Sequence, residues 1–570
     1  MRALFSLPFR LLRRLLRSLM LRTVADMRGG RKRYAKEALL RDIHEYTAVW
    51  AYLVGAAFLF LASEMALLVP SIAWAGSAVF LYRAWVRGCH GYYVASYQRN
   101  LTRLPPYRME SRALRQLKNQ FLGMGFLWES IHAQRLYDID LHKNQRFTRF
   151  SDGYYRARAY CNRQHHGLFA RAFARYLESD SLFNPWRPAP GLEGKTWLHT
   201  VGMPEGEQPV YQPLSTRVSH TIVFGTTRVG KTRMAEVLIT QDIHRGDIVI
   251  VFDPKGDREL LLRMYVEAKA AGREDQFYMF HLGFPDLSAQ YNPVGSFLRV
   301  TEVATRIANQ MPGEGQSAAF RDFVWRFVNV LGKMMEALSI KPSYLLIYRC
   351  AVNVDDLAAQ YFASILNREC PGWQKDFDDF DLSDAEKKQV SKTGRSIDAV
   401  RLSTFLKQKN LNDAVSDAVT GILGNERSYF EKLVSSLYPL LEKLTSGRVA
   451  ELISPNFKDL ADTRPIMDWR KVMEQNAVVY VGLDALTDAE VAAAVGNAMF
   501  ADLTSLAGQI YKHGHGYGQS GPTKKRMVAI HADEFNELIG NEFIPMLNKA
   551  GGAGYQVTAY TQTWSDVEAK

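Results

Sequence analysis

The segment Gly225–Thr232, with the sequence GTTRVGKT, constrains the fold of this chain more than any other feature. It matches the pattern GxxxxGK[ST], follows the apolar run His220–Phe224 and precedes the helical pattern TRMAEVLITQDI. In this strand–loop–helix context, glycines let backbone N–H groups wrap around phosphates. The side chain of Lys231 then reaches the β- and γ-phosphates, and the Thr232 hydroxyl ligates Mg²⁺. The sequence therefore predicts a phosphate loop that binds ATP and Mg²⁺.

A second motif supplies the acids that such a loop needs. The apolar run Met527–Ile530 is followed by His-Ala-Asp-Glu. At the end of a strand, Asp533 is predicted to hold Mg²⁺ and Glu534 to polarise the attacking water as a general base. The predicted nucleotide-binding residues are Gly225, Thr226, Thr227, Arg228, Val229, Gly230, Lys231, Thr232 and Arg233. The predicted metal ligands are Thr232 and Asp533.

Two further polar segments follow apolar runs. Gln562 comes just after the run Tyr555–Tyr560, where a glutamine senses the γ-phosphate or orients water; an ordinary polar loop residue is an equal alternative. Asp253–Asp257, with the sequence DPKGD, follows another run. Ligands bind at the carboxyl ends of strands in open α/β sheets, but Pro and Gly also favour a simple turn there. Spacing alone does not choose between these two interpretations.

Short apolar runs alternate with helical patterns from about residue 195 onward, which is typical of strands buried in a parallel sheet. The runs are His220–Phe224, Asp247–Phe252, Phe277–His281, Ala477–Val481, Met527–Ile530 and Tyr555–Tyr560. The segment between the third and fourth runs is almost wholly helical in pattern. We therefore predict an α/β domain with a mainly parallel sheet at residues 195–300 and 457–570, interrupted by an all-helical insertion at residues 301–456.

Two uncharged runs stand near the amino terminus. Tyr46–Ala62 and Met65–Tyr82 are separated only by Ser63 and Glu64. At about 1.5 Å per residue each helix is about 25 Å long, short but sufficient to span a bilayer. We predict a two-helix transmembrane hairpin at residues 46–86, with a mostly helical membrane-proximal region and linker at 87–194. A buried hairpin in a soluble core is the alternative.

Charge is unevenly placed along the chain. The formal net charge is +12, and the first 45 residues hold twelve Lys/Arg against four Asp/Glu, which leaves +8 there. This local excess predicts a basic cytoplasmic segment at residues 1–45 and both ends of the hairpin inside the cell. Within it, Leu4–Arg22 forms either a helix along the inner leaflet or a solvated basic helix. The four cysteines show no CxxC or metal-ligand spacing, which indicates reduced thiols in a cytosolic body.

The motifs GTTRVGKT, DPKGD, YNPVG, HADEFNEL and TQTWSD follow the hairpin in that order. From about residue 40 onward the chain resembles the conjugative coupling proteins of type IV secretion, the TraD/TraG group, especially those of integrating conjugative elements. The resemblance implies a RecA-like motor ATPase that forms a homo-hexamer on the bacterial inner membrane. Such a motor receives a relaxase–DNA complex with relaxosome proteins and pumps single-stranded DNA into the secretion channel.

Carried over by position, the resemblance implies that Lys231, Asp533, Glu534 and Gln562 are catalytic and that the helical insertion contacts DNA and relaxosome proteins. The chain departs from the family in its very small periplasmic turn. It also ends at Lys570, directly after the glutamine motif, where relatives continue with another strand and a tail, so either the chain is truncated or a sheet edge is left uncovered. A double-stranded DNA translocase of the chromosome-partitioning type and a non-catalytic membrane receptor for secretion substrates are the alternative functions.

Overall fold

The computed structural model describes residues 40–568 except for 66, 101–108, 116–117, 148–149, 164–166, 180–183, 185, 187–200, 202–206, 312–316, 436, 457–458, 515–526 and 539–542. The chain divides into two compact units. The first comprises Met1–Arg108 and Gly123–Val210, and the second comprises Met109–Leu122 and Tyr211–Lys570. The predicted Leu4–Arg22 helix and most of the predicted basic segment and linker lie outside the described residues.

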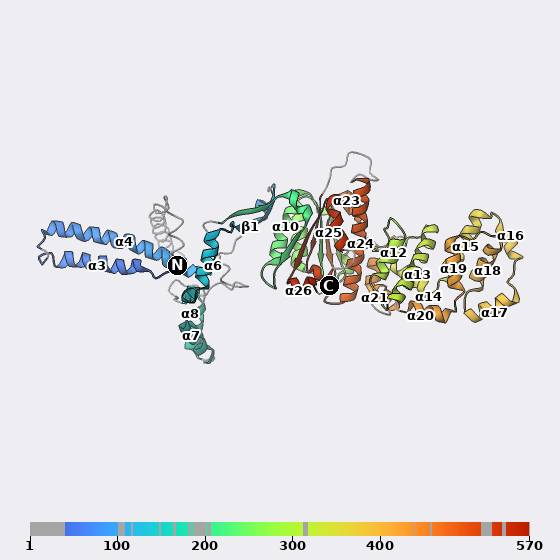
Figure 1. The fold of residues 1–570 in the computed structure, drawn as a ribbon, viewed down its shortest axis with the longest axis horizontal. Coiled ribbons are helices and arrows are strands. Elements are labelled where there is room, and N and C mark those ends of the chain that lie inside the picture. Colours follow the sequence, from blue (N-terminus) through green and yellow to red (C-terminus); the bar gives the residue numbers. More distant parts are fainter. Residues whose placement is uncertain are drawn as a thin grey trace. The chain divides into compact units, whose positions relative to one another are not determined.

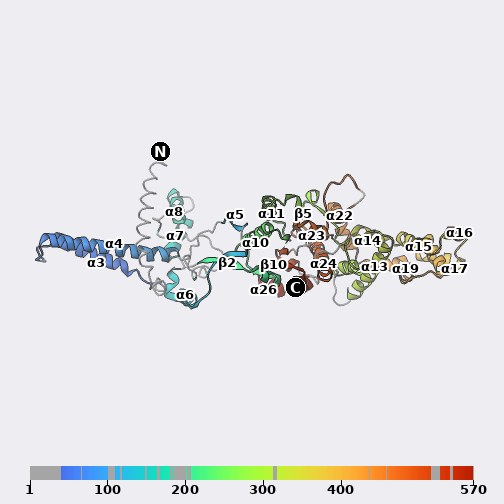
Figure 2. The same ribbon diagram turned by 90° about the horizontal axis from the view of Figure 1, so that it is seen from above.

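Two long helices lie side by side in the first unit (Figure 1, Figure 2). They are α3, His44–Leu61, and α4, Pro70–Asn100. Small residues allow their close approach, since a Cβ added at Gly55 would lie 2.9 Å from the ring of Phe80. Ser77 of α4 also donates a 3.0 Å hydrogen bond to a backbone carbonyl of α3. The two uncharged runs therefore form a helical hairpin.

The second helix of this hairpin differs from its predicted bounds. It begins at Pro70 rather than Met65, and proline is favoured at the first position of a helix. It then continues past Arg87 to Asn100, because the polar residues after Tyr82 are compatible with a helix. The predicted boundary between hairpin and membrane-proximal region thus falls inside one continuous helix.

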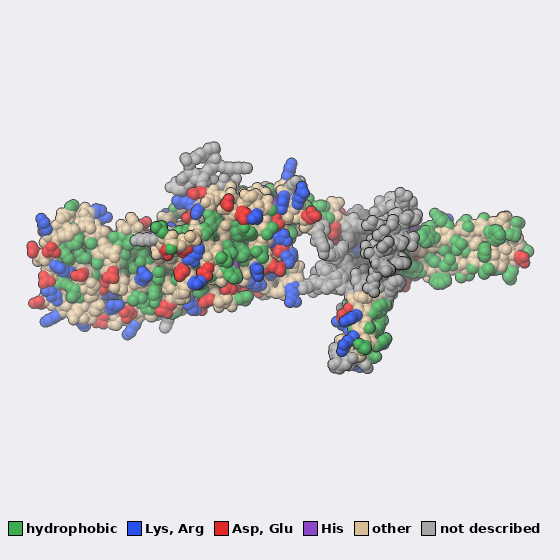
Figure 3. All heavy atoms as spheres, turned by 180° about the vertical axis from the view of Figure 1, so that it is seen from behind, with side chains coloured by type: hydrophobic (Ala, Val, Ile, Leu, Met, Phe, Trp, Pro, Cys, Tyr) green, Lys and Arg blue, Asp and Glu red, His purple; other side chains and the backbone are tan. Residues whose placement is uncertain are grey.

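The outer surface of the hairpin is apolar (Figure 3). Its exposed large side chains include Trp50, Val54, Phe58, Phe60, Ile72, Trp74, Val79 and Leu81. By length and composition, however, the one described helix that could cross a membrane is α24, Ala489–His513, and most of it is buried inside the second unit. Among the described helices, α3 and α4 do not meet that criterion.

The remainder of the first unit consists of short elements. They are α6 (Ser130–Asp140), η1 (His142–Phe147), α7 (Asp152–Arg163) and α8 (Leu168–Glu178), together with parts of the strands β1 (Gln120–Gly125) and β2 (Gln208–Gln212), which continue into residues of the second unit. β1 and β2 form a two-stranded sheet. Helices α7 and α8 pack around a small core of Tyr154, Cys161 and Leu177.

The second unit is built on a six-stranded sheet of order β3-β10-β9-β4-β8-β5, in which every pair is parallel. The strands are β3 (Thr221–Phe224), β4 (Ile248–Asp253), β5 (Phe277–His281), β8 (Val478–Gly482), β9 (Val528–Ala532) and β10 (Tyr555–Thr561). All six predicted runs are confirmed as strands. β3 lies at one edge, where the side chains of Ile222 and Phe224 are each 45% exposed.

Helices cover both faces of this sheet, and Figure 1 shows the sheet between α10 and α24. Alternate residues of β4 enter different cores, because successive side chains of a strand point to opposite faces. Val249 and Val251 pack against α10 and α11, whereas Ile250 and Phe252 pack on the α24 side. The covering helices are α10 (Lys231–Arg245), α11 (Arg258–Ala270), α23 (Trp469–Gln475), α24, α25 (Phe543–Lys549) and α26 (Trp564–Glu568).

Short elements complete the unit: α5 (Ser111–Leu114), η3 (Leu214–Ser219), η4 (Glu274–Gln276), η5 (Pro285–Leu287), η6 (Phe535–Glu537) and η7 (Ala550–Ala553).

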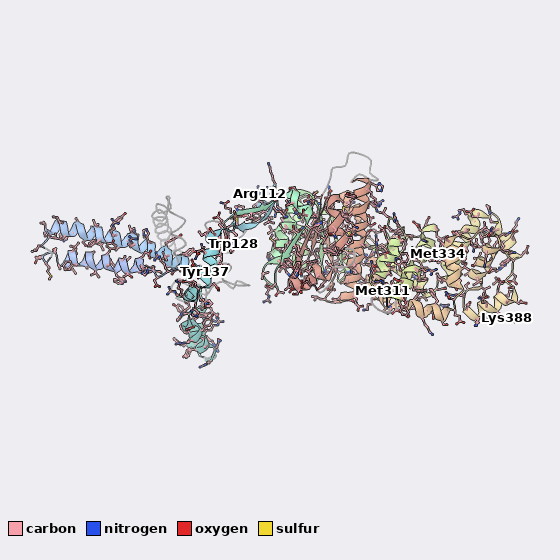
Figure 4. All side chains as sticks on the ribbon, in the orientation of Figure 1. Arg112, Trp128, Tyr137, Met311, Met334 and Lys388 are labelled. Carbon is pink, nitrogen blue, oxygen red and sulfur yellow. The ribbon has the colours of Figure 1, made fainter. Side chains whose placement is uncertain are left out.

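An all-helical insertion separates β5 from β8, as predicted. Figure 4 labels Met334 in the part nearer the sheet and Lys388 toward the far end. Its helices are α12 (Thr301–Ala308), α13 (Ser317–Ala337), α14 (Tyr344–Val352), α15 (Asp355–Glu369), α16 (Trp373–Asp378), α17 (Asp384–Thr393), α18 (Ile397–Gln408), α19 (Ala414–Leu423), α20 (Arg427–Val434), α21 (Tyr438–Leu444) and α22 (Gly447–Ile453). The chain enters and leaves it through a two-stranded parallel pair, β6 (Gln290–Tyr291) and β7 (Ile466–Met467), which sequence reasoning did not predict.

A buried polar cluster joins the insertion to the sheet domain. The Tyr291 hydroxyl of β6 donates a 2.6 Å hydrogen bond to Asp502 of α24, and Arg306 of α12 donates one of 3.4 Å to the same carboxylate. Burial raises the pKa of Asp502 to about 6, although the charge of Arg306 and the bond from Tyr291 oppose the shift. Burial therefore outweighs the ion pair at this carboxyl.

We expect this carboxyl to give the stability a measurable pH dependence. Because the folded chain binds the Asp502 proton more tightly than the unfolded chain, this stabilisation is complete below pH 4 and is lost as the pH rises through about 6. Between pH 5 and pH 7 the free energy of unfolding should fall by about 1 kcal/mol more for the native chain than for Asp502→Asn. Chemical denaturation of the full chain in detergent measures this difference, and equal pH slopes would contradict it.

Candidate nucleotide-binding site

The carboxyl ends of four neighbouring strands carry the predicted site residues. In the sheet register Phe224 pairs with Thr561, Ala559 pairs with Ala532, and Ala532 pairs with Phe252. Because these strands are parallel, the segments that follow them leave the same edge of the sheet. Those segments are the phosphate loop, TQTWSD, the acid pair and DPKGD. The fold therefore brings together motifs that lie far apart in the sequence.

The phosphate loop is tightly closed between β3 and α10. Gly225 donates its backbone N–H to a β10 carbonyl at 3.0 Å. A Cβ at Gly225 would lie 2.7 Å from the Val229 side chain and 3.0 Å from Cγ of Lys231, so only glycine fits there. Arg228 and Gly230 have positive φ angles of 63° and 102°. The loop thus turns sharply into α10, whose first backbone N–H groups have no partner within the helix and face an anion site.

The ammonium group of Lys231 carries the strongest signal for a ligand. Its Nζ atom is buried and has no hydrogen-bond partner among the described residues. A buried cation without a partner is costly to the folded state. Its charge also opposes the rise in the pKa of Asp533 that burial causes, so the loop and the acid pair lie within electrostatic reach of each other. An anionic group such as a phosphate would supply the missing partner.

The acid pair stands at the end of β9. The backbone N–H of Asp533 donates to the carbonyl of Phe252 at 2.9 Å, which fixes the pair beside β4. Burial, with the negative charges of Asp253 and Glu534, raises the pKa of Asp533 to about 6. This crowding of carboxylates favours a cation in the site.

The described residues contain no group of three or more His, Cys, Asp or Glu side chains that could hold a metal ion. Mg²⁺ is usually held by one or two protein ligands together with phosphate oxygens and waters. The Thr232 hydroxyl at the start of α10 and the Asp533 carboxylate are donors of that kind. The residues present therefore fit a nucleotide with Mg²⁺.

Glu534 is held by two donors in this structure. Lys255 of DPKGD forms an ion pair with its Oε1 atom, and Gln562 Nε2 donates a 3.2 Å hydrogen bond to the same oxygen. Glu534 itself has a φ of 39°, a left-handed conformation that is unfavourable for a residue with a side chain. Gln562 is thus a residue of the site and contacts the predicted general base.

The DPKGD turn is organised by its first residue. The carboxylate of Asp253, only 1% exposed, accepts hydrogen bonds from the backbone N–H groups of Lys255, Gly256 and Asp257 at 2.9, 3.1 and 2.6 Å. The Tyr480 hydroxyl donates another at 2.7 Å. Sequence reasoning left this motif undecided and so missed Lys255. Its position directly after a strand of a parallel sheet was the signal that could have identified it.

Other predicted binding residues lie on the outside of the loop. Thr226, Thr227, Arg228 and Val229 are exposed, so only their backbone groups can line the phosphate site. Arg233 forms ion pairs with Glu236 at 2.7 Å and with Glu259 at 3.1 Å. The structure therefore places the Arg233 side chain in contacts between α10 and α11.

A buried charged network lies beneath the site. Asp242 of α10 accepts hydrogen bonds from Arg217 at 2.6 and 2.9 Å and contacts the imidazole of His531 of β9 at 2.9 Å. The other ring nitrogen of His531 lies 3.0 Å from the Tyr560 hydroxyl of β10. Although burial opposes it, the charge of Arg217 and the bond with His531 hold the pKa of Asp242 well below its usual range. The network ties the phosphate-loop helix to the strands that carry the acid pair and Gln562.

The strand order and the geometry of the loop define this chain as a RecA-like P-loop NTPase with an inserted helical domain. Residues 209–270, which include β3, the phosphate loop and DPKGD, match a family model described as the type IV secretion-system coupling protein DNA-binding domain. This match agrees with the resemblance drawn from the motifs, and it covers residues 209–270 of the 570-residue chain. The match does not single out the TraD-like group.

Several solved structures are distantly similar to this chain. The bacterial conjugative coupling protein TrwBdeltaN70, in its unbound monoclinic form, is 16% identical, with a TM-score of 0.36 over 63% of this chain and 65% of that chain. Plasmid coupling protein TrwB in complex with ADP and Mg²⁺ is also 16% identical, with a TM-score of 0.32 over 63% and 67%. VirB4 of Thermoanaerobacter pseudethanolicus is 13% identical, with a TM-score of 0.28 over 64% and 77%. This chain spans slightly less than two thirds of the first of these proteins, and no curated protein matches it.

Proposed function

We propose that this chain is the inner-membrane coupling ATPase of a conjugative type IV secretion system, which uses ATP hydrolysis to drive single-stranded DNA transfer. The observation that carries the ATPase part is the buried, unpaired ammonium of Lys231 inside a closed phosphate loop. DNA as the substrate is supported by the match of residues 209–270 to a coupling-protein DNA-binding domain. The relaxase, the relaxosome proteins, the channel components and a homo-hexameric assembly are the partners that the motif resemblance implies.

The residues of the site have complementary roles in this proposal. Bound ATP and Mg²⁺ supply the scissile phosphoryl group and a cation that neutralises developing charge. Lys231 holds the β- and γ-phosphate oxygens, and Thr232 and Asp533 hold Mg²⁺. Glu534 accepts a proton from the attacking water at a carboxylate oxygen, and Gln562, which already contacts Glu534, orients that water.

Anchoring in the bacterial inner membrane is part of the same proposal. The apolar outer surface of α3 and α4 is what a helical hairpin presents to lipid, and exposed apolar patches of this size mark interaction surfaces. Trp50 and Trp74 are 69% and 61% exposed on this hairpin. With both ends in the cytoplasm, the hairpin leaves the second unit on the cytoplasmic side.

A Glu534→Gln variant tests this function directly. The amide cannot accept the water proton, so kcat for ATP hydrolysis should fall about 100-fold or more, while nucleotide binding is retained. Hydrolysis should be measured with the full chain in detergent, without DNA and with single- or double-stranded DNA. Glu336→Gln, at an exposed position of α13, is the matched control and should keep native turnover.

The outcomes of this assay separate the possible functions. Stimulation by single-stranded DNA that Glu534→Gln abolishes supports the proposal. Preferential stimulation by duplex DNA would indicate the partitioning-type translocase instead. Normal DNA transfer by the Glu534→Gln variant in mating cells would indicate a non-catalytic receptor and would contradict the motor.

A further inference from the structure

The pairing of Lys255 with Glu534 assigns a role to the DPKGD motif that the proposed function leaves open. In this structure, one carboxylate oxygen of Glu534, Oε1, receives both the Lys255 ammonium and the Gln562 amide. A general base needs a free oxygen lone pair to accept a proton from water. As the side chains stand, the oxygen nearest to these donors is occupied. While both donors stay in place, only the other oxygen of this carboxylate is left to accept a proton from water.

The backbone around Lys255 is held by hydrogen bonds, whereas its side chain reaches toward solvent. Asp253 fixes three consecutive backbone N–H groups of the turn, as described above. Gly256 has a φ of 72°, and a Cβ there would lie 2.5 Å from Nε2 of His281, so only glycine fits this position. The side chain of Lys255, by contrast, is 47% exposed, whereas that of Glu534 is 7% exposed. The ammonium group of Lys255 can therefore change position while the backbone of the turn stays in place.

The ammonium group of Lys255 keeps its positive charge in this environment. Burial lowers the pKa of Lys255, but the hydrogen bond and charge of Glu534, with the charges of Asp533 and Glu537, more than compensate and raise it. Lys255 therefore stays cationic at neutral pH. A cation poised at the same sheet edge as the phosphate loop will be attracted by any additional negative charge that enters the loop. A nucleoside triphosphate brings more negative charge into the loop than a diphosphate does, because it carries one more phosphate.

We propose that Lys255 is a specificity-determining residue that exchanges its ion-pair partner, Glu534 in the nucleotide-free site for the terminal phosphate of a bound triphosphate. The exchange frees Glu534 only when a hydrolysable nucleotide is present. It also makes the site prefer triphosphates to diphosphates. This inference rests on the proposed ATPase function and adds a residue whose effect is measurable by binding alone.

Equilibrium binding of two nucleotides, each with Mg²⁺, tests the exchange in the full chain. The probes are the non-hydrolysable analogue adenylyl imidodiphosphate and ADP. Lys255→Met should raise the Kd of the analogue about 10-fold, because a charge-assisted contact is lost, and should leave the Kd of ADP within about twofold. Lys255→Arg, which keeps the cation, should restore most of the preference. Lys388→Met, at an exposed position of α17, is the matched control and should change neither Kd.

The competition between Glu534 and phosphate gives a second, independent readout. In Glu534→Gln the lysine is held less strongly, so the Kd of the analogue should fall about 5-fold. In the double variant Lys255→Met/Glu534→Gln this gain should vanish. A gain that persists in the double variant would reflect simple removal of negative charge and would overturn the exchange.

Two other outcomes are equally decisive. Equal weakening of both nucleotides by Lys255→Met would mean that the residue only supports the site, and the inference would fail. If the native chain bound neither nucleotide, the proposed ATPase function itself would fail, and the inference with it. Thermal unfolding of each variant shows whether a lost affinity reflects lost folding.

Discussion

Replacing Lys231 with alanine is expected to lower kcat for ATP hydrolysis about 100- to 1000-fold. The ammonium group lies in the closed loop, is buried and lacks a partner, so its removal takes away the cation that the loop itself holds for the phosphates. Steady-state hydrolysis by the full chain in detergent, with single-stranded DNA, measures the loss. Lys333→Ala, at an exposed position of α13, is the matched control and should hydrolyse ATP at the native rate.

The same variant should lose activity but not stability. Removing a buried cation that has no partner removes its desolvation cost, so the nucleotide-free Lys231→Ala chain should unfold at the native Tm or slightly above it. Added nucleotide should raise the Tm of the native chain but not that of the variant. A Lys231→Ala chain that hydrolyses ATP normally, or that unfolds several degrees earlier, would contradict the assignment of this lysine to a ligand.

Replacing Asp242 with alanine is expected to destabilise the chain by about 3–5 kcal/mol. The carboxylate is fully buried and pairs with Arg217, which is 2% exposed, so the variant leaves a buried guanidinium without a counter-charge. The variant also removes the contacts of this carboxylate with Arg245 and His531. Chemical denaturation of the full chain in detergent measures the change in the free energy of unfolding.

A surface pair provides the control for this experiment. Arg427 and Glu431 form an ion pair in which both side chains are more than 40% exposed, so Glu431→Ala should cost less than about 1 kcal/mol. Replacing both buried partners, as Arg217→Met with Asp242→Leu, should recover much of the lost stability, because two apolar groups need no counter-charge. A single Asp242→Ala change with no larger effect than the surface control would refute the role of the network.

The strands of the sheet could be predicted from the sequence because each is a continuous apolar run. The predicted run Tyr555–Tyr560 falls within β10, and the other five runs agree with their strands to within one residue at the start and two at the end. The β6–β7 pair was missed because strands of two residues have no periodicity to detect. The extent of α4 was missed because the prediction followed the apolar run, which ends at Tyr82. The helix itself continues to Asn100, since a helical backbone does not require apolar side chains.

The residues of the phosphate loop and the acid pair could be predicted from their motifs, but their side-chain partners could not. The Lys255–Glu534 ion pair depends on β9 lying beside β4, and the sequence does not specify the order of strands. The network of Asp242 and His531 was missed for the same reason, since the sequence around a histidine in an apolar strand does not indicate which distant residue it contacts. Contacts between neighbouring strands therefore mark the limit of what the motifs could predict.

The insertion between β5 and β8 has a consequence for how the chain is made. Val249 of β4 pairs with Val478 of β8, so about 230 further residues must be synthesised after β4 before its first neighbouring strand exists. At roughly 5–20 residues per second the wait lasts roughly 10 to 45 s. During that time a strand with six buried residues has two unsatisfied edges on the ribosome. The insertion, whose helices mostly contact one another, can form in that interval, so newly made chains of this protein should depend on chaperones until β9 emerges.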